Sequence, residues 1–180
     1  MSENVVVLAG DLATFSGFAV GKQHPTCVSH RLPDLATVGE KLEAFEDFLC
    51  DLVEQHEPTW MAHEAPFVPN GAGMPTTRDT VLLLIKMCGV FELVAARYGC
   101  RTREVKVQTA RKHFAGSGRA DKADVAARCR ALGWPASNHN ESDACAVWSL
   151  SMALANPKWA PMATQLFALG RQGTTTGGSR

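Results

Sequence analysis

Residues 4–10, with the sequence Asn-Val-Val-Val-Leu-Ala-Gly, form a short apolar run rich in β-branched side chains. Because polar side chains do not alternate with apolar ones, the run is typical of a strand that is buried on both faces. Asp11 follows directly and ends the run. The sequence therefore predicts an interior strand with a carboxylate at its carboxyl end.

Apolar runs and the helical spacing of apolar side chains indicate the other elements of the fold. They predict strands at residues 15–21, 26–32, 60–64 and 101–107, and amphipathic or apolar helices at 35–56, 76–98, 120–132 and 140–155. This order is that of an α/β domain with a central mixed five-stranded sheet flanked by helices. Because strands and helices do not alternate regularly, we expect an antiparallel hairpin to open a sheet that continues in parallel.

The length of 180 residues suits one domain with a sizeable core. We expect this domain to cover residues 1–160, followed by an extension, residues 161–180, with a disordered end. No apolar run reaches the roughly 20 residues that cross a bilayer, and the N-terminus shows no signal-peptide pattern. Six cysteines without close CxxC spacing indicate free thiols in a reducing compartment, so we expect a cytoplasmic protein.

The charges balance, with 18 basic and 18 acidic side chains, which argues mildly against nucleic acid because many nucleic-acid-binding domains are basic. Their distribution is nevertheless uneven, and basic residues dominate residues 97–130, a segment that can present a basic face. The basic residues of this segment are Arg97, Arg101, Arg103, Lys106, Arg111, Lys112, Arg119, Lys122, Arg128 and Arg130, against Glu104, Asp121 and Asp124.

Three carboxylates occupy positions from which they can converge. Asp11 ends the first expected strand, Glu64 ends the fourth, and Asp143 lies in the first turn of the last long helix. Clustered carboxylates repel one another unless cations neutralise them, and Mg²⁺ prefers such oxygen ligands. Each acid also has a structural interpretation, as a turn residue or as a helix-start residue. Glu64 is the hardest to explain in that way, because apolar residues surround it on its strand.

Four segments form a more specific pattern when their order and spacing are taken together. Residues 7–20 hold an apolar strand, Asp11, and Ser and Gly before the next strand, and residues 64–67 hold a Glu followed three residues later by Phe67. Residues 111–122 hold a basic residue, Gly-x-Gly and a Lys before a helix, and residues 140–146 contain Asp-Ala-x-Ala. This set resembles the RuvC-type Holliday junction resolvases of the RNase H-like superfamily, in a divergent version that a phage could carry.

The resemblance implies an RNase H-like fold and a site for two Mg²⁺ ions, with Mn²⁺ as a substitute. It implies further that Phe67 stacks on the bases of an opened junction, although Phe67 is also interpretable as a loop aromatic that covers the core. The residues to which the resemblance gives roles toward the metal or in catalysis are Asp11, Glu64, Asp143 and Lys122. Those to which it gives contacts with DNA are Phe67, Arg111, Lys112 and Lys122, the basic ones being alternatively solvated surface charges.

Asn140 departs from the family's pattern, which has an acid or a His three residues before the last Asp. Its neutral amide oxygen is a weaker ligand, so Asn140, His139 or a water molecule completes the metal site, and Asn140 is also interpretable as a helix cap. Glu141 is expected to point elsewhere. Gly116-Ser-Gly118 is interpreted as a turn rather than as a phosphate cradle, because it matches no phosphate-binding fingerprint.

These inferences favour a structure-selective, Mg²⁺-dependent endonuclease that hydrolyses phosphodiester bonds in branched DNA such as Holliday junctions. A homodimer is expected, because a four-way junction has near two-fold symmetry and the resembling family dimerises through the helix that corresponds to residues 81–94. The main alternative is a catalytically weakened branched-DNA-binding protein of the same fold. An actin-like phosphotransferase is disfavoured, because 180 residues supply one half of that two-domain architecture.

Overall fold

The computed structural model describes residues 4–66 and 77–159. The described part contains one helix more than the sequence predicts. The elements are β1 (Val7–Asp11), β2 (Phe15–Gly21), β3 (Thr26–Arg31), α1 (Val38–His56), β4 (Trp60–Glu64), α2 (Arg78–Arg97), β5 (Arg101–Val105), α3 (Val107–Ala115), α4 (Lys122–Leu132) and α5 (His139–Ala155). The predicted extension, residues 161–180, lies outside the described residues.

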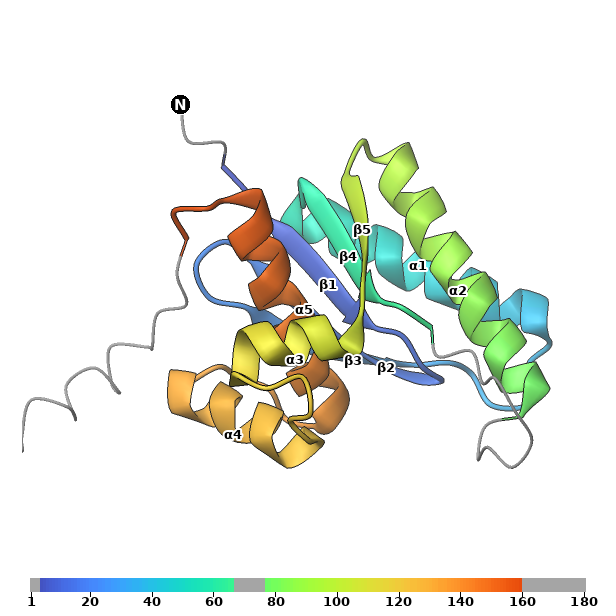
Figure 1. The fold of residues 1–180 in the computed structure, drawn as a ribbon. Helices are drawn as coiled ribbons and strands as arrows, with labels where there is room; N and C mark the ends of the chain where they lie inside the picture. Colours follow the sequence, from blue (N-terminus) through green and yellow to red (C-terminus); the bar gives the residue numbers. More distant parts are fainter. Residues whose placement is uncertain (1–3, 67–76, 160–180) are drawn as a thin grey trace, which may run out of the picture.

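The strands form one mixed sheet in the order β3-β2-β1-β4-β5. β1 pairs antiparallel with β2, and β2 pairs antiparallel with β3. β4 pairs parallel with β1, and β5 pairs parallel with β4. The predicted mixed five-stranded sheet, in which an antiparallel hairpin continues in parallel, is therefore confirmed (Figure 1).

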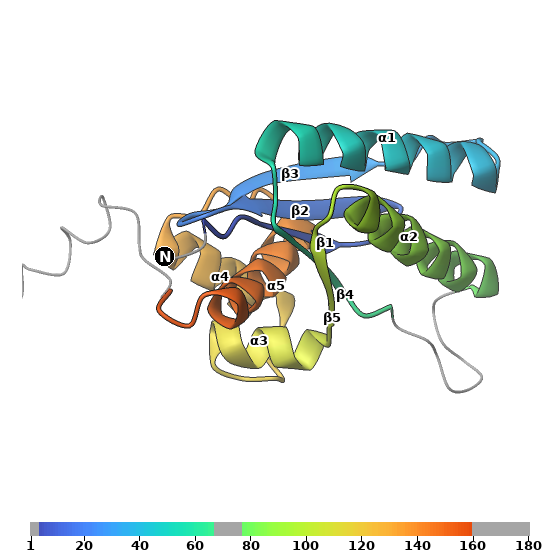
Figure 2. The same cartoon turned by 90° about the horizontal axis from the view of Figure 1, so that it is seen from above.

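Helices cover both faces of the sheet, α1 and α2 on one face and α3, α4 and α5 on the other (Figure 1, Figure 2). Successive side chains of a strand point to opposite faces. In β1, Val7 and Ala9 therefore join the apolar layer beneath α3, α4 and α5, whereas Leu8 joins the layer beneath α1 and α2. Because both layers are apolar, β1 needs no polar alternation, as its sequence indicated.

Helix α5 is the most deeply buried helix in contact with the sheet. We predicted an amphipathic helix here, and this is wrong, because its side chains are buried almost without interruption from Glu141 to Met152. The Trp148 indole Nε1 donates a hydrogen bond of 3.1 Å to the Val7 carbonyl, which fixes α5 against β1. The first turn of α5 is consequently held at a defined place over the sheet.

Helix α3 was not predicted, and the expected strand at residues 101–107 ends two residues early, at Val105. Its N-cap residue, Lys106, provides no side-chain cap, so the usual start signal of a helix is absent. Gly116 ends α3 with a φ of 83°, a left-handed conformation that favours glycine. The first glycine of Gly-x-Gly is therefore a helix C-cap, in agreement with its interpretation as a turn.

Three helices begin two or three residues later than the apolar pattern suggested, and capping side chains explain the differences. The Thr77 side chain accepts a hydrogen bond from the Thr80 N–H, so α2 begins at Arg78 rather than at residue 76. Thr37 and Glu40 form a capping box, so α1 begins at Val38 rather than at residue 35. Asp121 and Asp124 form another, so α4 begins at Lys122 rather than at residue 120. In each box the two side chains satisfy backbone N–H groups that the first helical turn leaves without partners.

All six cysteines are free thiols, as predicted. Over residues 4–66 and 77–159, no helix is both long and apolar enough to span a membrane.

Candidate active site

The carboxyl ends of β1 and β4 bring Asp11 and Glu64 together. The two strands are parallel neighbours, and Gly10 and His63 are their last paired residues. Asp11 and Glu64 are the next residue of each strand. Both continue the series of Ala9 and Ala62, whose side chains lie beneath α5, so both carboxylates face the start of that helix.

The N-terminal part of α5 supplies the third carboxylate. Asp143 is 4 % exposed and lies one turn into the helix. The helix start is held next to Asp11 by Gly17, the residue that pairs with Asp11 across the β1–β2 hairpin. A Cβ on Gly17 would overlap the main chain of Asn140 and Glu141, so only glycine allows this close approach.

Burial and the negative charge of neighbouring acids raise the pKa of Asp11 and of Glu64. Burial raises the pKa of Asp11 to about 6, and the negative charge of Asp143 adds to the effect. Burial also raises the pKa of Glu64 to about 8, with further contributions from Asp11 and Asp143. Arg111 and Lys122 act in the opposite direction on both acids, without cancelling the rise. The site is therefore short of positive charge.

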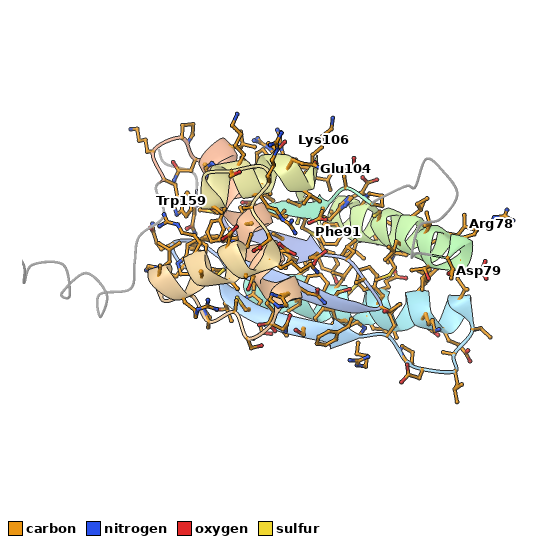
Figure 3. The ribbon with its side chains drawn as sticks, turned by 60° about the horizontal axis from the view of Figure 1, so that its bottom comes forward. Arg78, Asp79, Phe91, Glu104, Lys106 and Trp159 are labelled. Atoms are coloured by element: carbon orange, nitrogen blue, oxygen red, sulfur yellow. The ribbon has the colours of Figure 1, made fainter. Side chains whose placement is uncertain are left out.

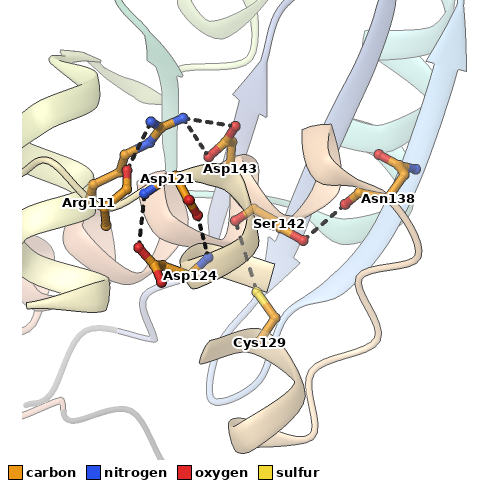
Figure 4. Close-up of polar contacts among 8 residues, drawn as sticks. Arg111, Asp121, Asp124, Cys129, Asn138, Ser142 and Asp143 are labelled. Atoms are coloured by element: carbon orange, nitrogen blue, oxygen red, sulfur yellow. Dashed lines mark hydrogen bonds and ion pairs between the residues drawn. The ribbon is translucent and has the colours of Figure 1, made fainter. Parts of the chain in front are cut away.

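Arg111, on α3, is the basic residue that contacts the acids directly. Its Nη2 lies 3.3 Å from each carboxylate oxygen of Asp143, and its Nη1 donates to the Ala120 carbonyl at 3.1 Å (Figure 4). The Arg111 side chain is 19 % exposed. The sequence suggested a phosphate contact or a solvated charge for Arg111, whereas the structure places it in an ion pair within the acidic site.

Lys122 is the first residue of α4 and is exposed. Its positive charge lowers the pKa of both Asp11 and Glu64, which places the ammonium group within electrostatic reach of the two acids. The capping box of Asp121 and Asp124 holds the backbone from which this side chain extends (Figure 4). An exposed cation beside half-buried acids is suited to contact an anion that enters the site from solvent.

Asn140 does not cap α5. The N-cap residue is Asn138, whose side chain accepts a hydrogen bond from the Glu141 N–H, so the cap interpretation of Asn140 is wrong. The Asn140 Nδ2 instead donates to the Phe15 carbonyl at 2.5 Å, which ties the helix start to β2. His139 precedes it as an exposed residue.

Glu141 is directed away from the three acids. Its carboxylate accepts hydrogen bonds from the Ser29 hydroxyl at 2.5 Å and from the Ser137 N–H at 2.7 Å. It therefore joins the start of α5 to β3.

Lys112 is exposed on α3. Phe67 lies outside the described residues.

The donor chemistry of the acidic site fits a hard divalent cation. Asp11, Glu64 and Asp143 offer carboxylate oxygens only, and the pKa values of the first two are raised by burial first and by neighbouring carboxylates second. As the side chains stand, no three His, Cys, Asp or Glu residues among those described form a ready set of metal ligands. Arg111 holds the Asp143 carboxylate in an ion pair.

Comparison with known proteins gives one sequence relative and several structural ones. No family model matches the chain. The crossover junction endodeoxyribonuclease RuvC of Halorhodospira halophila is 34% identical over 102 residues, which are 57% of this chain and 58% of that protein. The match thus spans little more than half the length of this curated relative.

Solved structures of resolvases share the fold. The RuvC structure of Thermus thermophilus matches with a TM-score of 0.66 at 18% identity, over 88% of this chain and 100% of that chain. The same protein in complex with a Holliday junction substrate also gives 0.66 at 18% identity, over 79% and 90% of the two chains. The yeast mitochondrial Holliday junction resolvase Ydc2 gives 0.63 at 10% identity, over 84% and 79%. The predicted RNase H-like fold and the resemblance to RuvC-type resolvases are therefore confirmed.

Proposed function

We propose that this protein is a metal-dependent endonuclease that cleaves branched DNA, such as Holliday junctions, by hydrolysing phosphodiester bonds. The observation that carries the proposal is the meeting of Asp11, Glu64 and Asp143 at the carboxyl ends of two parallel strands, with too little positive charge around them. A relative named as a crossover junction endodeoxyribonuclease and a fold shared with a junction-bound resolvase support it. A nuclease of this kind would act in the cytoplasm.

Asp11, Glu64 and Asp143 would hold the ion or ions, with Asn140, His139 or a water molecule at the remaining position. We propose Mg²⁺, replaceable by Mn²⁺, and two ions per site. When bound, such ions supply an activated water molecule and stabilise the charge that develops on the phosphate. Arg111 would release Asp143, in whole or in part, as the cations arrive, because it occupies both carboxylate oxygens in their absence.

We infer that Lys122 acts on the substrate. It is exposed, yet it influences the two most perturbed acids, so a phosphate that approaches them would also meet its ammonium group. There it would stabilise the extra negative charge of the transition state. Lys112 and Arg111 would add contacts to the DNA backbone, and Phe67 would stack on an unpaired base.

A homodimer formed through α2 would place two such sites on one junction. α2 exposes an apolar stripe made of Leu82, Ile85 and Leu93, which are 41%, 43% and 46% exposed, with Gly89 between them. Side chains three, four and seven residues apart share one face of a helix. Two-fold pairing of this stripe would bury it, and a four-way junction has near two-fold symmetry for the paired cuts.

Purified protein incubated with a labelled four-way junction and Mg²⁺ tests the proposed activity. We expect cleavage of the junction in preference to linear duplex of the same sequence, and loss of cleavage with EDTA. The substitution D11N should abolish cleavage, whereas D34N, the same change at an exposed acid in the loop before α1, should not alter it. Cleavage that persists in D11N would overturn the role of Asp11.

A catalytically weakened junction-binding protein is the second candidate, and Asn140 favours it. Its amide Nδ2 is engaged with the Phe15 carbonyl, and amide oxygen is a poorer ligand than carboxylate. Junction binding without cleavage in both Mg²⁺ and Mn²⁺ would support this candidate. Cleavage gained by N140D would then identify position 140 as the cause.

A further inference from the structure

His63 precedes Glu64 on β4 but lies on the other face of the sheet. Its side chain is 1 % exposed and sits in the layer beneath α2, where its ring meets that of Phe91 edge-on at 5.3 Å between centroids. Phe91 lies where α2 packs against the sheet (Figure 3). The candidate metal ligand and this imidazole are thus consecutive residues that point to opposite faces of the same strand.

The imidazole holds the main chain of Glu64. Its Nδ1 lies 3.0 Å from the Glu64 carbonyl oxygen. Because a carbonyl oxygen only accepts hydrogen bonds, the ring carries a proton on Nδ1 and donates it. The carbonyl at the end of β4 is therefore fixed by a side chain that is itself enclosed by apolar neighbours.

The environment of the other ring nitrogen, Nε2, indicates that His63 does more than fill space in the core. Nε2 has no hydrogen-bond partner among the described residues, and the nearest carboxylate oxygen, Glu92 Oε1 on α2, is 3.7 Å away. Glu92 is 56 % exposed, so this contact is weak. An apolar side chain would fill the same space without leaving a buried polar atom unsatisfied. The hydrogen bond from Nδ1 is what such a side chain would lose.

We propose that His63 is a positioning residue for Glu64, acting through the Nδ1 hydrogen bond to the Glu64 carbonyl. This inference rests on the proposed function in that Glu64 is taken as a metal ligand. β4 ends at Glu64, and beyond it Ala65 donates to the Val105 carbonyl as the last backbone tie to β5. The imidazole restrains the peptide between these two points, and with it the direction from which the Glu64 carboxylate reaches the site.

A Mn²⁺ binding assay without DNA tests this role separately from cleavage. Binding is measured as the loss of the free-ion signal in electron paramagnetic resonance. Three variants separate the contributions of the two ring nitrogens. H63N keeps a donor close to the position of Nδ1, H63Q keeps one close to Nε2, and H63L keeps neither. Residues that orient metal ligands typically contribute about tenfold or more to metal affinity. We therefore expect about tenfold weaker binding in H63L and H63Q, and a substantial rescue in H63N.

The matched control is H24L, at an exposed histidine of the β2–β3 turn, which should bind Mn²⁺ like the wild type. Thermal unfolding of H63L should show a single cooperative transition, and in cleavage assays the Mg²⁺ concentration at half-maximal rate should rise more than the maximal rate falls.

Wild-type affinity in H63L overturns the inference, and so does rescue by H63Q in place of H63N. A wild type that binds no divalent cation overturns both this inference and the proposed function. If the variants bind Mn²⁺ as expected but the wild type cuts no junction, the proposed nuclease activity fails while the role of His63 stands.

Discussion

Arg111 and Asp143 form an ion pair in which one guanidinium nitrogen lies 3.3 Å from both carboxylate oxygens. The other terminal nitrogen of Arg111 donates to the Ala120 carbonyl, so this one side chain joins α3, α5 and the segment that leads into α4. Among the described residues, Asp143 is the one of the three acids in direct contact with a cation. The protein thus carries a resident positive charge at the site where metal is proposed to bind.

R111A should destabilise the metal-free protein, because it leaves the nearly buried Asp143 without its partner. Removal of one member of a buried pair costs about 3 kcal/mol, and the partial exposure of Arg111 makes this an upper value. Urea denaturation in EDTA measures the change in the free energy of unfolding. In the D143N background the same substitution should cost much less, and an equal cost in both backgrounds would contradict the importance of the pair.

The raised pKa values of Glu64 and Asp11 predict how the stability of the metal-free protein depends on pH. The folded state binds protons more tightly than the unfolded state, so this contribution is complete below the unfolded pKa and is lost as the pH rises through the folded pKa. For Glu64 the pKa rises from 4.5 to about 8, so stability should fall across that interval. The Asp11 contribution should fall between 3.8 and about 6.

E64Q should therefore unfold at a higher temperature than the wild type at pH 8.5 in EDTA, and the difference should shrink toward pH 5. Each unit of pKa shift corresponds to about 1.4 kcal/mol, so the gain is on the order of a few kcal/mol. Mg²⁺ should raise the unfolding temperature of the wild type but not that of E64Q. A pH-independent difference between the two proteins would argue against a strained carboxylate at this position.

G17A should disturb the site although it replaces none of the three acids Asp11, Glu64 and Asp143. The added methyl group would overlap the main chain of Asn140 and Glu141, so the start of α5 must move away from β2. Forced overpacking costs about 1–3 kcal/mol, and Asp143 would move with the helix. Mn²⁺ affinity and thermal unfolding report the two effects. G39A is the matched control, because Gly39 is an exposed residue of α1 with ample space, and there alanine should stabilise by about 0.5–1 kcal/mol.

The sequence predicted the strands better than the contacts of the site, for a physical reason. The apolar composition of residues 4–10 and 60–64 by itself indicates buried strands. Because β1 and β4 are parallel neighbours, their pairing brings Asp11 and Glu64 together whatever surrounds them. The partner of Arg111 depends on α3, a nine-residue helix without a side-chain cap, whose position comes from packing against α5 and α4. Local pattern contains no signal for such a contact.

The start of α5 shows the same limit on a smaller scale. Two asparagines, Asn138 and Asn140, are both acceptable N-caps by residue type. The structure selects Asn138, because Asn140 is engaged by the Phe15 carbonyl of β2. The pattern along the helix therefore did not identify which of the two asparagines caps α5.

For Glu141 we predict a pH dependence of stability that is opposite in sign to that of Glu64. Burial alone would raise the pKa of Glu141, but hydrogen bonds from Ser29, from the Ser137 backbone and side chain, and from Asn138 lower it below its usual value. A lowered pKa contributes stability that is present above the unfolded pKa of 4.5 and is lost as the pH falls through the folded pKa. The tie between α5 and β3 should accordingly weaken in acid.

E141Q should reduce the free energy of unfolding at pH 7 by about 2 kcal/mol, the usual contribution of hydrogen bonds to a charged acceptor. The deficit should diminish as the pH falls below 4.5 toward the lowered pKa at which the folded wild-type carboxylate takes up a proton. Urea denaturation of both proteins across this range isolates Glu141, because Glu64 and Asp11 titrate in each. S29A removes one donor and should cost less than E141Q. A deficit that stays constant from pH 7 to pH 3 would show that the shape of the side chain, and not its charge, holds the start of α5 on β3.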